Sequence, residues 1–595
     1  MNVAAWVRAV RAGFEPFRPE PGDASAANPT GDEPSPGSAA RAPRRTLGSV
    51  RIPSAVGIAL GGCAAAFALL LYLGRDHDFY FDEWDFVIHA PDWTLRDYFV
   101  PHNEHWSTLP MLSYRVLIGI FGMGSYTPFR IAVLLLHVTA AFVLFLIVRR
   151  KAGDLLGIAA AALLLVASQG AENIFWAFQV GFVGSILFGL VAIYLLLDPP
   201  RNRLRPAVAS GALVASLACS GVGIFFLPTV AVDLVLDRAR RRLLWVLGAP
   251  VVAYGVYFLT FGRRNATVHR SPLEADLLRE LATYVPVGVG RGLAGMLSLG
   301  AHFSMVALAA GAAGFALLLA RVRPLPTLAI GAAVGLVAQY TVIGMVRAQF
   351  GDQQAMASRY IYIATVLGLL IFTAALAQLP FTGLWRPATA VVLVGLLVHD
   401  VVLLAREAEE RATLMAGQEV RLQTAWLLRD APGFDPTGVP DQVRAPTLTA
   451  GAYVQARTEL GTQYPERTIA DVASWPGPEV DAAVRAVLPP EVIVTATPPA
   501  QGECAELDPA APSREVEVTD GTRVWFTSTS TFPVSLEIRD WMLGGPTEVA
   551  QELQTVEPGQ TVIITIPDSG RDLVRRLQVT SPVGTAGMVC WSPTS

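Results

Sequence analysis

Long apolar runs alternate with short charged segments along most of the chain, and this alternation is its dominant pattern. A helix that crosses the hydrocarbon core of a bilayer needs about 20 mostly apolar residues. Runs of this kind lie at 54–74, 127–149, 154–168, 179–197, 206–220, 222–236, 242–261, 301–320, 326–346, 360–379 and 387–405. The pattern predicts a polytopic α-helical membrane protein with about eleven transmembrane helices.

One further apolar segment, residues 272–300, does not fit this description. Five charged residues interrupt it: Glu274, Asp276, Arg279, Glu280 and Arg291. Charged side chains are costly in hydrocarbon, so we interpret this segment as an interfacial or re-entrant helix and not as a twelfth span.

The basic residues between the runs predict the orientation of the chain. Clusters at 149–151, 201–205, 238–242 and 321–323 all fall on the same side as the arginine-containing N-terminal tail. Cytoplasmic loops carry an excess of Lys and Arg, so this side is expected to be cytoplasmic, in the plasma (inner) membrane. With eleven spans the C-terminal region is then extracytoplasmic.

The C-terminal region is polar and has a different periodicity. From Glu503 onward, short segments alternate apolar and polar residues between Gly and Pro turns, which predicts a small β-sandwich, of jelly-roll or carbohydrate-binding type among other options. Cys504 and Cys590 bracket this region and can form a disulfide in an oxidising compartment; two free thiols are the alternative.

These patterns divide the chain into four parts. They are a disordered cytoplasmic tail (1–50), a membrane domain (51–409) with a large first outer loop (75–125), a mixed extracytoplasmic connecting region (410–500) and the β-sandwich (501–595).

Composition supports a membrane protein and excludes one class of partner. Of the 595 residues, 52% are hydrophobic and only 16% are charged, which is unlike a soluble globular protein. The net charge of −4 and the absence of a long basic run argue against nucleic acid as a partner.

The first outer loop carries the most unusual chemistry of the chain. Residues 75–106 hold eight acidic residues and four histidines among many aromatics, whereas most connections between membrane helices are short. Functional groups are often placed on loops that a rigid scaffold positions. We therefore interpret this loop as the active centre.

The predicted topology gathers other polar residues onto the same outer face. The candidate site residues are Asp82, Glu83, Asp85, His102, Glu104, His105, Glu172, Asn173, Trp176, Gln179, Arg347, Arg359 and Tyr360. A carboxylate can accept a proton from a hydroxyl nucleophile, arginines can bind a phosphate leaving group, and aromatics can stack on a sugar. Together these parts suit glycosyl transfer from a lipid-phosphate sugar.

The sequence FDEWDF at 81–86 resembles the Asp-Glu motif of the GT-C glycosyltransferase superfamily. The pattern is most similar to the protein O-mannosyltransferases; the aminoarabinose transferases and the arabinofuranosyltransferases share its plan. This resemblance implies a polyprenyl-phosphate sugar donor and a reaction on the extracytoplasmic face. HNEH (102–105) and ENIFW (172–176) depart from the mannosyltransferase pattern, which leaves the sugar and the acceptor open.

The resemblance also implies roles for individual residues. Asp82 is expected to be the general base, Glu83 to orient the acceptor or share a proton, and Asp85 to be the alternative partner. Arg359 and Arg347, with Tyr360 beside them, are candidates for the donor phosphate. The remaining candidates are expected to bind substrate: His102, Glu104, His105, Glu172, Asn173, Trp176 and Gln179.

A metal remains an alternative role for part of this loop. His102, Glu104 and His105 could hold an ion, and Asp76 with Asp78 could bind a divalent cation, but the spacing supports no specific site, and no cofactor is assigned.

The sequence therefore predicts a membrane glycosyltransferase that uses a polyprenyl-phosphate sugar in the lipid bilayer. Its acceptor would be a hydroxyl of a cell-envelope glycan, lipid or protein. The alternative is a non-enzymatic transporter, flippase or scaffold for envelope lipids or glycans.

Overall fold

The structure is a computed structural model. It describes residues 54–199, 202–263, 274–378, 385–499, 502–510, 512–545, 552–571, 573–585 and 587–592. The predicted cytoplasmic tail, residues 1–50, lies outside the described residues.

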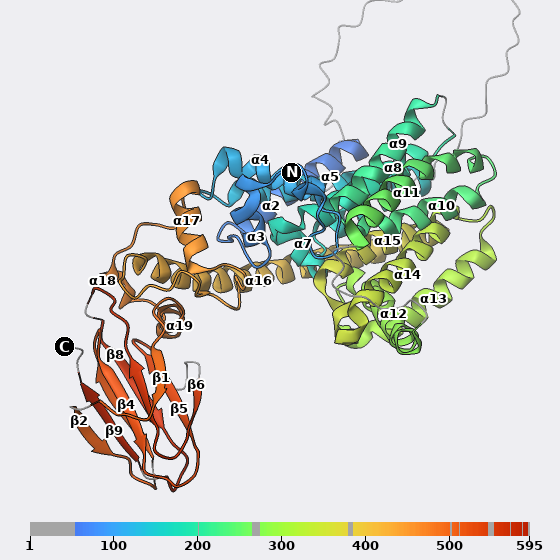
Figure 1. Cartoon of the computed structure of the whole chain (residues 1–595). Helices are drawn as coiled ribbons and strands as arrows, with labels where there is room; N and C mark the ends of the chain where they lie inside the picture. Colours follow the sequence, from blue (N-terminus) through green and yellow to red (C-terminus); the bar gives the residue numbers. More distant parts are fainter. Residues whose placement is uncertain are drawn as a thin grey trace, which may run out of the picture.

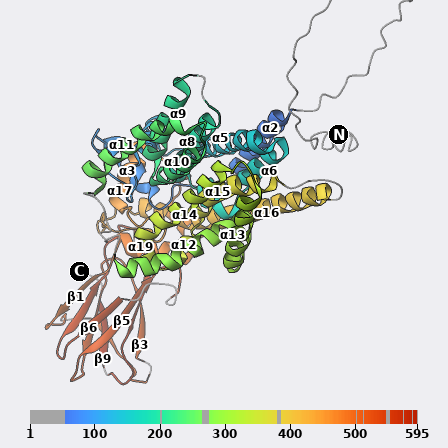
Figure 2. The same cartoon turned by 90° about the vertical axis from the view of Figure 1, so that its right-hand side faces the viewer.

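Most of the described chain forms a helical bundle, which one very long helix connects to a β domain (Figures 1 and 2). The bundle contains α2 (Ala55–Leu73), α3 (Glu83–His89), α4 (Thr108–Phe121), α5 (Thr127–Ala152), α6 (Asp154–Leu165), α7 (Ala171–Phe175), α8 (Val180–Leu196), α9 (Leu204–Cys219), α10 (Phe226–Leu236), α11 (Gly248–Tyr257), α12 (Ala275–Met296), α13 (Ser304–Arg321), α14 (Thr327–Arg347) and α15 (Ser358–Leu376). The long helix is α16 (Trp385–Leu427), followed by α17 (Ala450–Leu460), α18 (Ile469–Val472) and α19 (Gly477–Val487).

Short 3₁₀ and π segments extend or join several of these helices. They are η1 (Ala90–Asp92), η2 (Asp97–Phe99), η3 (Ser168–Gly170), η4 (Ala177–Gln179), η5 (Gly221–Phe225), η6 (Arg241–Leu247), η7 (Phe258–Gly262), η9 (Ala301–Phe303), η10 (Ala348–Phe350) and η11 (Asp352–Met356).

The predicted fold class is confirmed: the chain is a polytopic helical membrane protein with a C-terminal β domain. Within the described residues, eight helices are long and apolar enough to cross a membrane. The pair Asp154–Leu165 and Ser168–Phe175, bent by 47°, is either a broken span, which would bring the number to nine, or a re-entrant loop. The predicted count of eleven is not confirmed, because the helices at Leu204–Cys219 and Gly221–Leu236 are apolar but short. Of the charged segment 272–300, the part Ala275–Met296 forms α12, which is not among the candidate spans.

The long helix α16 joins the membrane domain to the first outer loop. Its apolar N-terminal half passes without a break into the charged stretch that begins at Arg406. Beyond that point the carbonyl of Ala408 lies 3.0 Å from His77 Nε2, and Gln418 Nε2 donates to the carbonyl of Phe79 at 2.8 Å. The Phe81 amide donates to the carbonyl of Arg444 at 2.7 Å. The loop is therefore held against α16 and the segment that follows it.

The β domain is an antiparallel sandwich. Its strands are β1 (Glu491–Thr495), β2 (Glu503–Glu506), β3 (Ser513–Val518), β4 (Arg523–Ser528), β5 (Val534–Trp541), β6 (Glu552–Val556), β7 (Thr561–Thr565), β8 (Arg575–Thr580) and β9 (Gly587–Ser592). One sheet has the order β1-β7-β4-β9-β2 and the other β3-β8-β5-β6. Alternate residues of both sheets, such as Phe526 and Ile538, share one buried core, as the alternating pattern predicts.

A disulfide and two buried charges fix this domain. Cys504 and Cys590 face each other on β2 and β9 and form the disulfide that the sequence allows. Asp481 of α19 is buried and accepts the backbone N–H groups of three consecutive residues, Met542, Leu543 and Gly544. Arg575 of β8 donates to the carbonyl of Leu488 at the end of α19 at 3.0 Å. The sandwich is thus attached to the helical part by hydrogen bonds between buried polar groups.

Candidate active site

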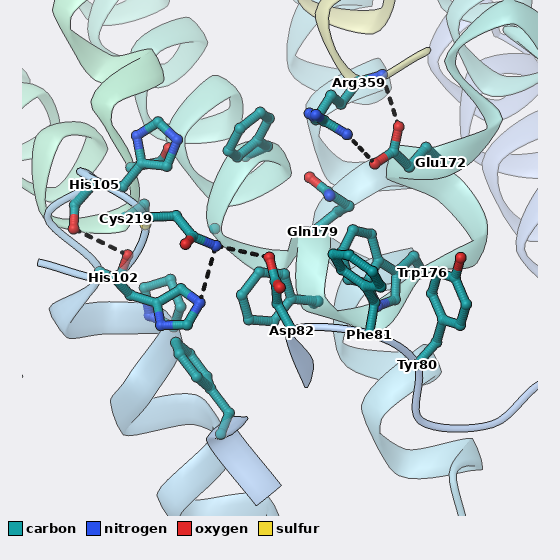
Figure 3. A pocket seen from close by; sticks show the side chains of 18 of the residues that line it. Tyr80, Phe81, Asp82, His102, His105, Glu172, Trp176, Gln179, Cys219 and Arg359 are labelled. Carbon is teal, nitrogen blue, oxygen red and sulfur yellow. Dashed lines mark hydrogen bonds and ion pairs between the residues drawn. The ribbon is translucent and has the colours of Figure 1, made fainter. Parts of the chain in front are cut away.

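The outer end of the helical bundle contains a cavity of about 450 Å³. It lies where the first outer loop meets the start of α8, the end of α9, the end of α14 and the start of α15. Figure 3 shows side chains that line it. Nine of the predicted site residues line it: Asp82, His102, His105, Glu172, Trp176, Gln179, Arg347, Arg359 and Tyr360. These residues are distant in sequence, and the topology inferred from the charge pattern had placed them on one face.

Asp82 presents its carboxylate to this cavity from the start of α3. The residue before it, Phe81, has a positive φ of 52°, which is strained for a bulky side chain and turns the chain sharply into the helix. Asp82 Oδ2 accepts a hydrogen bond from Asn103 Nδ2 at 2.7 Å, which leaves Oδ1 available to a ligand. Burial raises the pKa of Asp82 above its ordinary value, which makes the carboxylate a better base.

Glu83, the next residue, points the opposite way and is completely buried. Its Oε2 accepts hydrogen bonds from Tyr126 Oη at 3.0 Å, Trp176 Nε1 at 3.1 Å and the Tyr80 amide at 3.2 Å. Its Oε1 shares a short hydrogen bond with the hydroxyl of Tyr114. The carboxyl group therefore joins α3 to α4, to the start of α5 and to the segment between α7 and η4.

The burial of Glu83 corrects one expectation from the sequence. Glu83 does not line the cavity, so it cannot orient an acceptor directly. Burial raises the pKa of Glu83 to about 8, while the hydrogen bonds oppose that shift. The donors at its two oxygens favour the ionised form, and burial outweighs them. Glu83 is a positioning residue.

The HNEH segment is a tight turn. The amide of His102 donates to the carbonyl of His105 at 3.1 Å, and the amide of His105 donates back to His102 at 2.9 Å. The two central residues, Asn103 and Glu104, have φ of 46° and 67°. Two positive φ values between mutually bonded ends define a type I′ turn, in which Asn is favoured and Glu is strained. The turn directs the Asn103 amide at Asp82.

The two histidines of this turn line the cavity as neutral groups. His102 Nε2 lies 3.2 Å from Asn103 Nδ2, and its Nδ1 lies 3.5 Å from the carboxylate of Asp85, which itself lies outside the cavity lining. Burial lowers the pKa of His105 to about 4 and also lowers that of His102. The structure does not bring these residues together as metal ligands: among the described residues there is no group of three side chains suited to hold an ion.

The opposite wall carries the arginines. Arg359 Nη1 donates to Glu172 Oε1 at 2.8 Å, and the Arg359 backbone amide donates to the other oxygen at 3.3 Å. Asn173 is buried behind this pair and donates to the Arg359 carbonyl at 3.0 Å, so it braces the wall and does not line the cavity. These bonds attach α7, beyond the bend after α6, to the start of α15.

The second arginine has a similar arrangement. Arg347 Nη2 lies 3.4 Å from the carboxylate of Glu104, which again supports the wall without lining the cavity. The Arg359 guanidinium lies 5.1 Å from the centre of the Tyr360 ring, within cation–π range. Each guanidinium carries five N–H groups and has one carboxylate partner, so both retain donors for a phosphate.

An apolar groove of about 430 Å³ adjoins the polar cavity. It runs between α4, α5, α8 and α9, and it shares Pro110 and Cys219 with the cavity. Its other lining residues are Leu109, Leu112, Ser113, Val116, Leu117, Ala132, Leu136, Val180, Gly184 and Phe188. The groove contains no charged side chain.

A second, polar cavity of about 200 Å³ adjoins the first on the side of α16. Tyr80, Glu172 and Trp176 line both cavities, and the Tyr80 and Trp176 rings pack edge to face with centres 5.8 Å apart. The remaining lining comes from one face of α16: Glu407, Glu410, Arg411, Leu414 and Met415.

The sequence analysis missed two contributions to the site. Asn103 lies inside HNEH, and its preference for positive φ was a usable signal for a tight turn. The residues of α16 follow the i, i+3, i+4, i+7 spacing of one helix face from Glu407 to Leu414. Nothing in that spacing indicates that the face meets a loop more than 300 residues earlier in the sequence.

No protein-family model and no curated protein matches this chain. Two solved structures are similar. ArnT from Cupriavidus metallidurans in the apo state is 15% identical with a TM-score of 0.44, covering 74% of this chain and 93% of that one. The Archaeoglobus fulgidus oligosaccharyltransferase tethered to an acceptor peptide is 12% identical with a TM-score of 0.40, covering 69% of this chain and 61% of that one. No residue role or substrate is carried over from either.

The buried carboxyl of Glu83 predicts a specific pH dependence of stability. Its pKa in the folded protein, about 8, is above its ordinary value of 4.5, so the folded state binds the proton more tightly. This stabilisation is complete below about pH 4.5 and is lost as the pH rises to about 8. Glu83→Gln, which keeps the shape of the neutral form, should remove that loss. Thermal unfolding midpoints in detergent at pH 5, 7 and 9 measure it.

The control is Asp92→Asn, which changes an exposed acid of the same loop and should keep the wild-type pH slope. Asp78, whose pKa burial raises to about 6, titrates in all three proteins and cancels in the comparison. If the unfolding midpoint of Glu83→Gln depends on pH as that of the wild type does, Glu83 does not titrate between pH 5 and 9.

Proposed function

We propose that this protein is a membrane glycosyltransferase that moves a sugar from a polyprenyl-phosphate donor to an acceptor hydroxyl. One observation carries the proposal: a cavity with a carboxylate on one wall and two arginines on another adjoins an apolar groove, and two residues line both. A lipid-linked sugar phosphate has the matching order of parts, which are an apolar chain, a phosphate and a sugar.

The donor is bound from the lipid side. The isoprenoid chain occupies the apolar groove, and Pro110 and Cys219 mark the point where the groove meets the polar cavity. The phosphate lies at Arg359 and Arg347, whose remaining N–H groups form charge-assisted hydrogen bonds with its oxygens. Glu172 and Glu104 hold the two guanidinium groups in place before the donor arrives.

Asp82 acts as the general base. The acceptor oxygen attacks the anomeric carbon, and its proton passes to Asp82 Oδ1 while the bond between the anomeric carbon and the phosphate oxygen breaks. The polyprenyl phosphate leaves with its charge stabilised by the arginines. Attack from the side opposite the leaving group inverts the anomeric centre.

The acceptor approaches through the second cavity. This cavity lies beside α16 after the helix becomes charged, whereas the apolar groove lies among membrane helices. Its wall of Tyr80 and Trp176 suits contact with a sugar face, and its carboxylates accept hydrogen bonds from hydroxyl groups. Glu407 is paired with Arg411 at 2.8 Å, and the carboxylate of Glu410 makes no hydrogen bond or ion pair with a described residue. An acceptor rich in hydroxyl groups fits this surface better than an anionic one.

The site faces the extracytoplasmic side of the plasma membrane. The first outer loop contacts the outer part of α16, so the site lies on the same side as the C-terminal domain. That domain contains a disulfide, which persists in oxidising compartments. The basic end of α5, Arg149 to Lys151, lies at the other end of the membrane domain from this loop.

Asp82→Asn tests the reaction. The amide keeps the size of the side chain but cannot accept the proton, so transfer should fall by about 10²–10⁴-fold while donor binding is retained. Membranes containing either protein are incubated with a panel of radiolabelled polyprenyl-phosphate sugars and crude envelope acceptors. Asp92→Asn is the matched control, because Asp92 is an exposed acid of the same loop. Full transfer by Asp82→Asn would exclude Asp82 as the base.

The pH profile gives a second readout in the same assay. Asp82 must be ionised to act, so kcat/KM should fall as the pH drops below its pKa. Because burial raises that pKa, the acidic limb should lie above pH 3.8. Asp92→Asn should retain this limb.

Leu414→Trp tests the route of the acceptor. Leu414 lines the second cavity and its side chain is partly exposed, so an indole can fill the space without disturbing a core. The acceptor KM should rise about tenfold or more, while donor binding and the rate at saturating acceptor change little. Thr413→Trp places the same ring at an exposed position beside the cavity and is the control. An unchanged acceptor KM in Leu414→Trp would place the acceptor elsewhere.

A further inference from the structure

Gln179 has an unusual environment for a polar side chain. It ends η4 at the start of the α8 span, only 3% of it is exposed, and it lines the main cavity. In Figure 3 its amide points into the cavity in the space between the Arg359 side chain and Asp82.

Within the part of the chain that the structure describes, this amide has no hydrogen-bond partner. Oε1 is buried and accepts no hydrogen bond, and Nε2 donates none. Gln423, another buried glutamine, differs: its Nε2 donates to the Pro465 carbonyl at 3.0 Å, and its Oε1 accepts from Arg457 Nη1 at 3.1 Å. A buried amide without a partner costs free energy, so its place in a cavity wall indicates that a ligand completes its hydrogen bonds.

The backbone around Gln179 is fixed before any ligand binds. The Gln179 amide N–H donates to the Trp176 carbonyl at 3.0 Å, and Trp176 Nε1 donates to the buried Glu83. Ala177, which follows Trp176, donates its N–H to the Tyr126 hydroxyl at 3.0 Å. The side chain therefore projects from a rigid turn, which is the arrangement of a group that selects a ligand.

The position of Gln179 identifies the part of the ligand that it meets. With the donor phosphate at Arg359 and the acceptor hydroxyl at Asp82, the donor sugar lies between them, beside Gln179. A primary amide both donates and accepts hydrogen bonds, as a hydroxyl group does, and it carries no charge that would select an ionic group.

We propose that Gln179 binds a ring hydroxyl of the donor sugar and makes the enzyme select donors in which that hydroxyl is free. This inference rests on the proposed function. A site built to hydrogen-bond a hydroxyl rejects an analogue that lacks it, because the protein amide is then buried unpaired. Donor sugars that are deoxygenated or acylated at this position are rejected.

The test compares donor binding with and without the protein amide, and with and without the substrate hydroxyl. Equilibrium binding of short-chain polyprenyl-phosphate sugars, each with its set of mono-deoxy forms, is measured on the full-length protein in detergent without acceptor. The wild type should bind one hydroxylated donor about tenfold or more tightly than one of its deoxy forms. Gln179→Met, which preserves the shape but removes the amide, should bind the two equally.

Gln423→Met is the matched control, since it removes a buried glutamine amide that already has partners and does not line the cavity. It should keep the wild-type ratio between the hydroxylated and deoxy donors. The deoxy comparison in the wild type requires no mutation, so a folding defect cannot decide the result.

The outcomes separate the two levels of the proposal. Two outcomes would overturn the role of Gln179 alone. In one, the wild type binds hydroxylated and deoxy donors equally; in the other, Gln179→Met still prefers the hydroxylated donor. If no sugar donor binds more tightly than bare polyprenyl phosphate, and the bare lipid also fails to bind, the proposed function itself would be overturned. Discrimination that disappears only in Gln179→Met supports both.

Discussion

The buried carboxyl of Glu83 is the interaction on which the rest of the site depends. Hydroxyl groups from α4 and from the start of α5, the indole of Trp176 and a loop amide converge on its two oxygens. Burial of a carboxyl is unfavourable unless its hydrogen bonds are made, and here they come from four separate parts of the chain. Movement of any one part would leave polar groups unpaired in the core, so the site is rigid without its substrate.

Asp82 and Glu83, the neighbouring acidic residues of FDEWDF, have different tasks. Successive residues of a helix point in directions about 100° apart, so the start of α3 can send Glu83 into the core and Asp82 into the cavity. The first fixes the loop, and the second is free to act on a ligand. The same core bonds reach Gln179 through Trp176, and the type I′ turn that bears Asn103 holds Asp82 from the other side. The proposed base and the proposed sugar-binding group are thus supported by a common framework.

Much of this arrangement was predictable from the sequence, because hydropathy and charge are local signals. The apolar runs located the helices, and the alternation after Glu503 indicated the sandwich. The membrane orientation predicted from the basic loops then placed Asp82, Glu172 and Arg359 on the same face. What could not be predicted were contacts between distant segments. Whether Glu83 or Asp82 faces the core depends on Tyr114 and Trp176, which no local pattern connects to the loop. The contribution of α16 depends on its packing against residues more than 300 positions earlier.

We propose that the cavity and the apolar groove together bind one lipid-linked donor. An experimental structure of the protein in lipid with a polyprenyl phosphate bound would test this. The phosphate should lie within hydrogen-bond distance of the Arg359 guanidinium, with the chain passing Pro110 and Cys219 into the groove. A phosphate remote from Arg359, or a chain that leaves the groove empty, would contradict this proposal.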